Sequence, residues 1–345
     1  MSFDTQLHAQ PVLCIMGPTA AGKTALATEL AERCQGELIS VDSALVYRGL
    51  DIGAAKPSYP HHLIDIRDPS EPYSAAEFVH DATRCVHEIR SRGRLPIFVG
   101  GPMLYYRALF AGLDDMPASD SRVRDGIEKR ARSHGWPALH AELAKVDPVL
   151  AAKLHPNHSQ RISRGLEIWE MTGKPLSEWQ TGRHEQAISG EFLPLAICPS
   201  DRHVLHARIE QRFNAMLAEG FIDEVTALHA RGDLTVDVPA VRAVGYRQLW
   251  SWLDGEVSLE QATARAIAAT RQLAKRQLTW LRGWSSLTWL RTDSAGYPEA
   301  IEPAGLGLQV KWPEMNINGQ EIAGNGRYQA VIEVLTHWLR NYLTG

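Results

Sequence analysis

The segment Gly17–Thr24, with the sequence GPTAAGKT, places the strongest constraint on how this 345-residue chain folds. It fits G-x-x-x-x-G-K-[ST], a loop that surrounds phosphate groups with backbone N–H donors. The apolar run Val12–Met16 precedes the loop, and a helix-forming run from Ala25 to Glu32 follows it. Because a strand before and a helix after are the context that this loop requires, we predict a site for a diphosphate or triphosphate.

The chemistry expected of each residue in the loop follows from its type. Glycine lets the backbone approach phosphate oxygens closely, and the helix that follows adds its partial positive charge. Lys23 supplies a charge for the outer phosphates, and the Thr24 hydroxyl is a ligand for Mg²⁺. The predicted phosphate-binding residues are Gly17, Pro18, Thr19, Ala20, Ala21, Gly22, Lys23 and Thr24.

Composition excludes several classes of protein. The chain is 44% hydrophobic and 22% charged, as in ordinary globular proteins. It lacks the run of about 18 apolar residues needed to span a bilayer, and residues 1–10 do not read as a secretory signal. Its four cysteines are scattered, which predicts a reducing compartment and no structural zinc. We therefore expect a cytoplasmic protein with no membrane partner.

Apolar patterns along the chain predict the secondary structure. Strands are expected at residues 12–16, 37–41, 95–99 and 192–198, and helices at 74–92, 203–217 and 259–284; residues 62–66 form a short apolar group. Residues 122–173 contain helix patterns only, and residues 293–326 are expected to form loops. An amphipathic helix carrying Val331, Leu335, Trp338 and Leu339 on one face is expected to end the chain.

These elements predict an α/β fold. Strands that alternate with helices form a parallel sheet covered on both faces, here a P-loop NTPase-like core with a parallel sheet flanked by helices. An all-α insertion domain is expected within it. We assign residues 1–117 and 191–345 to the core with its C-terminal helices, and residues 118–190 to the helical insertion.

Two segments follow strands at the edge of the sheet where ligands bind in open α/β folds. Asp42 follows the strand at 37–41, where a carboxylate suits a general base, a Mg²⁺ ligand or a structural turn. Gly100-Gly101-Pro102 follows the strand at 95–99 and is either part of the same site or ordinary helix capping.

Basic residues gather in three places despite the net charge of -4. On a helix over 271–282, Arg271, Lys275 and Arg282 fall within about 40° of each other, and Leu273, Gln277 and Trp280 are expected to form an apolar back on the opposite side. Arg161 and Arg164 are a second group, and Arg242 and Arg247 flank Tyr246 in a third. Basic groups beside aromatic residues favour a nucleic-acid phosphate backbone as partner.

Several motifs, taken in order, resemble one known family. They are GPTAAGKT, ISVDSALVYRGLDIGAAKP, VGGPMLYYRAL, SQRISRGLEIWEMTGKP, RAVGYRQLW and RQLAKRQLTWLRGW. From about Pro11 to Trp284 the chain is similar to the bacterial tRNA dimethylallyltransferases, the isopentenyl-tRNA transferases of the MiaA type. That resemblance implies transfer of a dimethylallyl group from dimethylallyl diphosphate to N6 of adenosine-37, 3′ of the anticodon, in tRNAs reading codons that begin with U, with release of diphosphate. It implies a monomer that uses Mg²⁺ held by Thr24 and binds the tRNA anticodon stem-loop.

The resemblance also assigns roles to residues. Asp42 would accept the N6 proton, while Lys23 and Arg212 would hold the diphosphate. Pro102 stands at a catalytic position where the family usually has threonine, and it offers neither a side-chain hydrogen bond nor an N–H. The residues implied to contact tRNA are Asp42, Ser43, Ala44, Leu45, Pro102, Arg124, Gln160, Arg161, Ile162, Ser163, Arg164, Arg242, Ala243, Val244, Gly245, Tyr246, Arg247, Lys275, Arg276, Gln277, Leu278, Thr279, Trp280, Leu281 and Arg282.

Three other functions use some of the same features. A small-molecule kinase would use ATP at the same loop, and an adenylate prenyltransferase would modify a free nucleotide. A nucleotide-dependent RNA-binding protein would need no general base. The basic helix and the helical insertion favour a tRNA substrate over the first two, and Asp42 favours an enzyme over the third.

Overall fold

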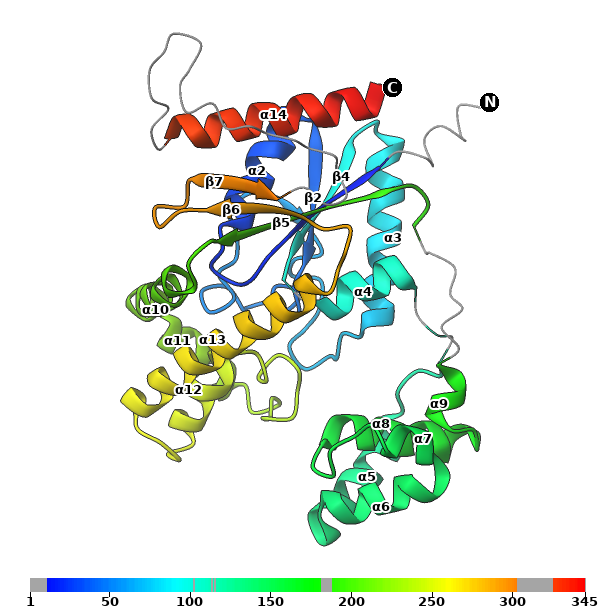
Figure 1. Ribbon diagram of the computed structural model, residues 1–345. Coiled ribbons are helices and arrows are strands. Elements are labelled where there is room, and N and C mark those ends of the chain that lie inside the picture. Colours follow the sequence, from blue (N-terminus) through cyan, green and yellow to red (C-terminus); the bar gives the residue numbers. More distant parts are fainter. Residues whose placement is uncertain are drawn as a thin grey trace. The chain divides into compact units, whose positions relative to one another are not determined.

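The computed structural model describes residues 11–101, 103–112, 114, 116–180, 188–302 and 325–344. The chain divides into two compact units, residues 1–110 with 187–345 and residues 111–186. Figure 1 shows the elements of both. In the described part of the chain, no helix is long and apolar enough to cross a membrane.

The first unit is built on one sheet. Its strands are β1 (Val12–Met16), β2 (Gly36–Val41), β3 (His61–His62), β4 (Leu95–Gly100), β5 (Phe192–Pro199), β6 (Thr288–Thr292) and β7 (Pro298–Glu302). Within the described residues, seven strands pair in the order β3-β2-β4-β1-β5-β6-β7. All neighbours are parallel except β6 and β7. The mostly parallel sheet with its helices confirms the predicted α/β fold.

Helices cover both faces of this sheet (Figure 1). Alternate residues of a strand point to opposite faces, so a strand that is apolar throughout needs helices on both sides. The helices of this unit are α2 (Lys23–Arg33), α3 (Ala75–Ser91), α4 (Met103–Ala111), α10 (Arg202–Ala218), α11 (Phe221–Ala230), α12 (Tyr246–Leu253), α13 (Leu259–Arg282) and α14 (Asn325–Thr344). Leu13 and Ile15 belong to the core that includes α2 and α14. Cys14 and Met16 belong to a second core with α3, α4 and α13.

The second unit contains helices only in its described part. They are α5 (Ser121–His134), α6 (Trp136–Val146), α7 (Pro148–Ala151), α8 (Ser159–Thr172) and α9 (Leu176–Trp179). Its core is a separate cluster centred on Ile127, Leu143 and Ile162. The prediction of helices alone between 122 and 173 is confirmed.

The short apolar group at 62–66 contributes only His62 to the two-residue strand β3, because Leu63 and Asp65 have φ angles of 64° and 56°, outside the extended region. One local prediction was wrong. The loop expected at 293–326 contains β7, which pairs antiparallel with β6. Of the terminal helix, Val331, Leu335 and Leu339 are buried as predicted, while the Trp338 side chain lies outside the described residues.

Candidate active site

The loop between β1 and α2 has a backbone that only certain residues permit. Gly17 has φ +150°, and a Cβ there would lie 2.4 Å from the Ile197 carbonyl oxygen of β5. Gly22, the N-cap residue before α2, has φ +94°. Any larger residue at Gly17 would push the loop away from the sheet. The loop therefore lies at the carboxyl end of β1 with the N-terminus of α2 beside it, the geometry of an anion site.

Two cations and one carboxylate share this site. Burial, together with the charge of nearby Arg212, lowers the pKa of Lys23 to about 8, while Asp42 opposes the change. Burial also lowers the pKa of Arg212 from its ordinary value, again opposed by Asp42. The Lys23 Nζ donates to the Pro18 carbonyl at 2.7 Å. Since Arg212 disfavours the charge of Lys23, an anion placed between the two cations would be stabilised by both.

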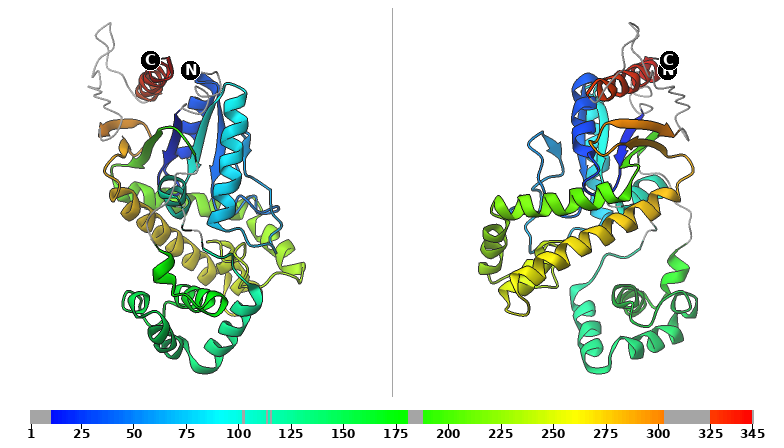
Figure 2. Two further views of the ribbon diagram at one scale, coloured as in Figure 1. Left: turned by 90° about the vertical axis from the view of Figure 1, so that its right-hand side faces the viewer. Right: turned by 60° about the vertical axis from the view of Figure 1, so that its left-hand side comes forward.

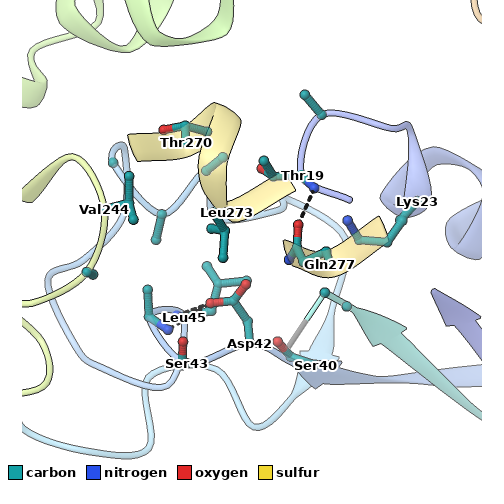
Figure 3. Close-up of a pocket in the computed structure, with 18 of the residues that line it drawn as sticks. Thr19, Lys23, Ser40, Asp42, Ser43, Leu45, Val244, Thr270, Leu273 and Gln277 are labelled. Carbon is teal, nitrogen blue, oxygen red and sulfur yellow. Dashed lines mark hydrogen bonds between the residues drawn. The ribbon is translucent and has the colours of Figure 1, made fainter. Parts of the chain in front are cut away.

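Asp42 follows β2 directly and has one carboxylate oxygen fixed by its own backbone. Its Oδ1 accepts hydrogen bonds from the N–H groups of Ala44 at 2.7 Å and Leu45 at 3.2 Å. In the described part of the chain, its other oxygen has no hydrogen bond. Figure 3 shows the carboxylate beside Leu45 in the cavity wall, with Lys23 also in view. The turn therefore holds a carboxylate at the cavity with one oxygen able to accept a proton.

Helix α13 is tied to the phosphate loop by one side chain. The buried Gln277 accepts a hydrogen bond from the Thr19 N–H at 2.9 Å through its Oε1 (Figure 3). The two residues are 258 positions apart in the sequence. Gln277, predicted as a tRNA contact, thus also fixes the loop's backbone.

The orientation predicted for helix α13 was wrong. Leu273, Gln277 and Trp280, expected on an apolar back, line the cavity instead. The packing face passes through Ala274, Leu278 and Leu281, which are buried. Trp280 is 39% exposed, with the Arg107 guanidinium 5.8 Å from its ring centroid. Regular spacing tells which residues share a face, but not which face meets the core.

These groups line one cavity of about 490 Å³ at the carboxyl ends of β1, β2 and β4. Helices α10 and α13, which pack together, form another wall (Figure 2). The predicted site residues that line it are Thr19, Ala20, Lys23, Thr24, Asp42, Ser43, Ala44, Leu45, Arg212, Arg242, Ala243, Val244, Tyr246, Arg276, Gln277 and Trp280. The cavity thus brings together segments that the sequence separates widely.

Other predicted residues of this unit do not line the cavity. Gly17, Pro18, Ala21 and Gly22 shape the loop, and Gly245 precedes α12. Lys275, Thr279, Arg247 and Arg282 are exposed, whereas Leu278 and Leu281 are buried and pack the helix. Tyr246 does line the cavity, but it is only 1% exposed and packs edge-to-face on Phe221. Pro102 lies outside the described residues.

Sequence reasoning missed several residues of the cavity. Phe213 and Met216 from α10 and Thr270 from α13 line it, as does His61. Burial lowers the pKa of His61, so its ring stays neutral down to a lower pH than the ring of a free histidine. Met216 follows Arg212 at the i, i+4 spacing of a helix, which is a local signal that could have found it.

In the second unit, two predicted contacts are engaged internally. The fully buried Glu167 carboxylate accepts hydrogen bonds from Arg124 at 3.2 Å and Arg164 at 2.9 Å. Arg164 also donates to the Pro117 carbonyl at 2.6 Å. Of the neighbouring predicted contacts, Gln160 and Arg161 are exposed, whereas Ile162 and Ser163 are buried and pack α8.

Metal ligands in the described residues are few. No group of three or more His, Cys, Asp or Glu side chains is placed to hold a metal ion there. Thr24, on the exposed first turn of α2, lines the cavity, and its hydroxyl would supply a single oxygen ligand. A hard cation that takes most of its ligands from water and phosphate fits this arrangement better than a cation needing a full protein cage.

Comparisons with known proteins give a consistent result. Residues 45–284 match the family model described as IPP transferase. The tRNA dimethylallyltransferase 2 of Hahella chejuensis is 53% identical over 309 residues, covering 84% of this chain and 93% of that protein. The tRNA dimethylallyltransferase of Bordetella petrii is 58% identical over 282 residues, covering 79% and 90%.

Solved structures agree. A full-length tRNA isopentenylpyrophosphate transferase from Bacillus halodurans is 35% identical with a TM-score of 0.63, covering 96% of this chain and 97% of that chain. A eukaryotic dimethylallyltransferase crystallised in the act of modifying tRNA is 28% identical with a TM-score of 0.67, covering 83% and 74%. The chain therefore belongs to the IPP transferase family.

Proposed function

We propose that this chain transfers the dimethylallyl group of dimethylallyl diphosphate to N6 of adenosine-37, 3′ of the anticodon, in tRNAs reading codons that begin with U. The observation that carries the proposal is the single cavity where Lys23 and Arg212 face the Asp42 carboxylate. The naming of the relatives as tRNA dimethylallyltransferases supports the substrate class. The chain is accordingly a prenyl transferase that acts on tRNA.

The negative charge of the donor's leaving group gives the two cations their role. The exocyclic amine of adenine is a poor nucleophile, so breakage of the allylic C–O bond must be assisted. Negative charge then grows on the diphosphate, where the loop N–H groups, Lys23 and Arg212 stabilise it. Because the pKa of Lys23 is already lowered by burial, its charge is poorly solvated before the donor binds. An incoming diphosphate therefore gains more from it than from an exposed lysine.

The acceptor amine must lose a proton, which gives Asp42 its role. As the N6–C bond forms, the amine becomes acidic and its proton passes to the free Asp42 oxygen, while the C–O electron pair leaves with the diphosphate. An adenine stacked within the anticodon loop cannot reach the Asp42 carboxylate, so adenosine-37 must be extruded into the cavity. Ser43, Ala44 and Leu45 line the wall beside the carboxylate. Unpaired bases around it would be read by shape, stacking and hydrogen bonds.

Magnesium is part of the proposal. Thr24 would hold the ion together with diphosphate oxygens and water. When bound, Mg²⁺ neutralises part of the charge on the leaving diphosphate. We further propose that the protein acts as a cytoplasmic monomer with no membrane partner, since reduced cysteines and a tRNA substrate both suit that compartment.

A comparison of acceptors tests the function. The protein is incubated with labelled dimethylallyl diphosphate, Mg²⁺ and either unmodified tRNA, AMP or ATP. Label is expected in tRNA only. Label in AMP or ATP would favour the adenylate prenyltransferase, and ATP hydrolysis with a small acceptor would favour the kinase.

The lowered pKa of Lys23 predicts a pH dependence. Below about pH 8 the ammonium is charged and binds the donor; as pH rises through about 8, the free enzyme loses that charge. We therefore expect kcat/KM for dimethylallyl diphosphate to fall about tenfold per pH unit above that pKa, because this ratio reports groups of the free enzyme. Initial rates between pH 6.5 and 9 measure the profile. A flat profile to pH 9 would contradict the role of Lys23.

The second unit offers a matched pair of variants. Arg161 is exposed and has no ion pair within the described residues, whereas Arg164 is tied to Glu167 and Pro117. We expect Arg161→Ala to weaken tRNA binding and to reduce the slope of log Kd against log salt by about 1, because one phosphate contact is lost. We expect Arg164→Ala to reduce the free energy of unfolding by about 1–3 kcal/mol, because a buried carboxylate loses a partner.

Filter binding at several salt concentrations and thermal melting separate the two effects. An Arg161→Ala protein with unchanged tRNA affinity and salt slope would remove this residue from the interface. An Arg164→Ala protein that melts like the wild type would show that its bonds to Glu167 and Pro117 do not support the fold.

A further inference from the structure

One carboxylate outside the cavity accepts four hydrogen bonds. Glu224, in the first turn of α11, accepts from the N–H groups of Asp51 at 3.0 Å, Ile52 at 2.6 Å and Gly53 at 3.1 Å. It also accepts from the Tyr246 hydroxyl at 2.6 Å. Burial and the Glu224 charge raise the pKa of Tyr246, so the hydroxyl stays protonated and donates. A single side chain thus joins the segment after the 42–45 turn to helix α12.

The same segment rests directly on an aromatic pair. A Cβ at Gly53 would lie 2.0 Å from Phe221 Cε2 and 2.7 Å from Tyr246 Cζ, so glycine is required for this approach. The Phe221 and Tyr246 rings meet edge-to-face with centroids 4.9 Å apart. Glu224 therefore holds three successive N–H groups from one side while the rings support the backbone from another. The segment has little freedom to move.

This segment is a wall of the active-site cavity. Gly53, Ala54, Ala55 and Pro57 line the cavity, whereas Glu224 does not. Ala55 and Pro57 also line an adjoining cavity of about 410 Å³, as does Arg212. The wall is therefore next to the cation proposed to hold the diphosphate. Because Gly53–Ala55 carries no side chain larger than a methyl group, the backbone position alone sets the width of the cavity there.

We propose that Glu224 is a positioning residue that fixes the 51–57 wall, and that the wall determines how the allylic diphosphate is held and how long its prenyl chain can be. This inference rests on the proposed function of the cavity. Glu224 acts through the backbone it anchors and does not touch either substrate. A carboxylate suits the task because its oxygens together provide about four acceptor sites, one for each donor. A displaced wall would leave the diphosphate misaligned with Arg212 and would open space beside the dimethylallyl group.

Glu224→Gln tests the anchor with little change in shape. Its amide keeps one acceptor oxygen but turns an NH₂ group towards N–H donors, so the segment must shift. We expect KM for dimethylallyl diphosphate to rise about tenfold to a hundredfold, because a misplacement of about 1 Å can have an effect of that size. The Kd for tRNA stays within about twofold. The control is Asp223→Asn, since Asp223 is an exposed acid in the same first turn of α11 and should leave both constants unchanged.

Gly53→Ala displaces the same wall from the other side, through the contact with Phe221 and Tyr246. It should therefore reproduce the raised donor KM. Both variants should also use geranyl diphosphate better, raising the ratio of geranyl to dimethylallyl kcat/KM about tenfold over wild type. Circular dichroism and tRNA binding confirm that each variant is folded. A well-folded Glu224→Gln protein with wild-type donor KM and chain-length ratio would overturn the inference.

The outcome for the wild-type protein separates the two proposals. If the wild type modifies tRNA and Glu224→Gln behaves identically, the positioning role fails while the function stands. If the wild type transfers no dimethylallyl group to tRNA, the function itself fails. An equal loss of donor and tRNA affinity in Glu224→Gln would mean a general structural role, which also contradicts the inference.

Discussion

Replacing Asp42 by asparagine is expected to lower the rate of dimethylallyl transfer by about 10²–10⁴-fold, the usual contribution of a general base. The amide oxygen of the new side chain would still accept hydrogen bonds from the N–H groups of Ala44 and Leu45, so the turn after β2 should survive. The change removes only the charge and the proton acceptor. Single-turnover transfer with saturating tRNA and donor measures the chemical step without product release.

The comparison with Asp42→Ala shows which property matters. Alanine also removes the acceptor for the two N–H groups, so this variant should melt earlier than Asp42→Asn while having a similarly low rate. Both variants should bind tRNA like the wild type. If Asp42→Asn transfers within threefold of the wild-type rate, Asp42 is not the base, and its place in the cavity wall is structural.

Arg212→Ala is expected to lower kcat/KM for dimethylallyl diphosphate by about 10²–10³-fold, since one preorganised cation at the leaving group is lost. The KM for tRNA should change little. The matched control is Arg208→Ala, one turn earlier on α10. Arg208 donates to the Ser294 carbonyl at 3.1 Å and does not line the active-site cavity. Initial rates against donor concentration separate the two arginines.

A second readout tests the coupling between the two cations. Arg212 contributes to the lowered pKa of Lys23, so its removal should shift the alkaline fall in kcat/KM to higher pH. An Arg212→Ala protein with unchanged donor dependence would remove Arg212 from the diphosphate site. An unchanged pH profile together with a large loss of kcat/KM would mean that the two side chains do not interact.

The central fold was predictable because its strands are buried on both faces. Runs such as VLCIM in β1 and FLPLAICP in β5 are apolar throughout, as parallel strands between two helix layers must be. Strand β7, with the sequence PEAIE, was missed because only Ile301 in it is a branched apolar residue. Its structure comes from pairing with β6 at the edge of the sheet, which local sequence does not encode.

The site was predictable where residues follow strands directly. Lys23 and Asp42 follow β1 and β2, parallel strands that end at the same edge of the sheet with β4 between them, so a shared site follows from topology. The hydrogen bond from Thr19 to Gln277 and the four bonds to Glu224 join distant segments, and no local pattern signals them. Resemblance to the family placed Leu278, Leu281 and Ile162 at the tRNA interface, but their side chains are buried. A motif gives positions along a helix without giving the face that each position occupies.

The product of the reaction tests the central claim most directly. Unmodified tRNA is incubated with the protein, Mg²⁺ and dimethylallyl diphosphate, then digested and analysed by oligonucleotide mass spectrometry. The account predicts one added five-carbon group on adenosine-37, at N6, with diphosphate released in equal amount and none of either product from the Asp42→Asn protein on the same timescale. Modification of another nucleotide, or tRNA left unchanged by the wild type while ATP is consumed, would contradict it.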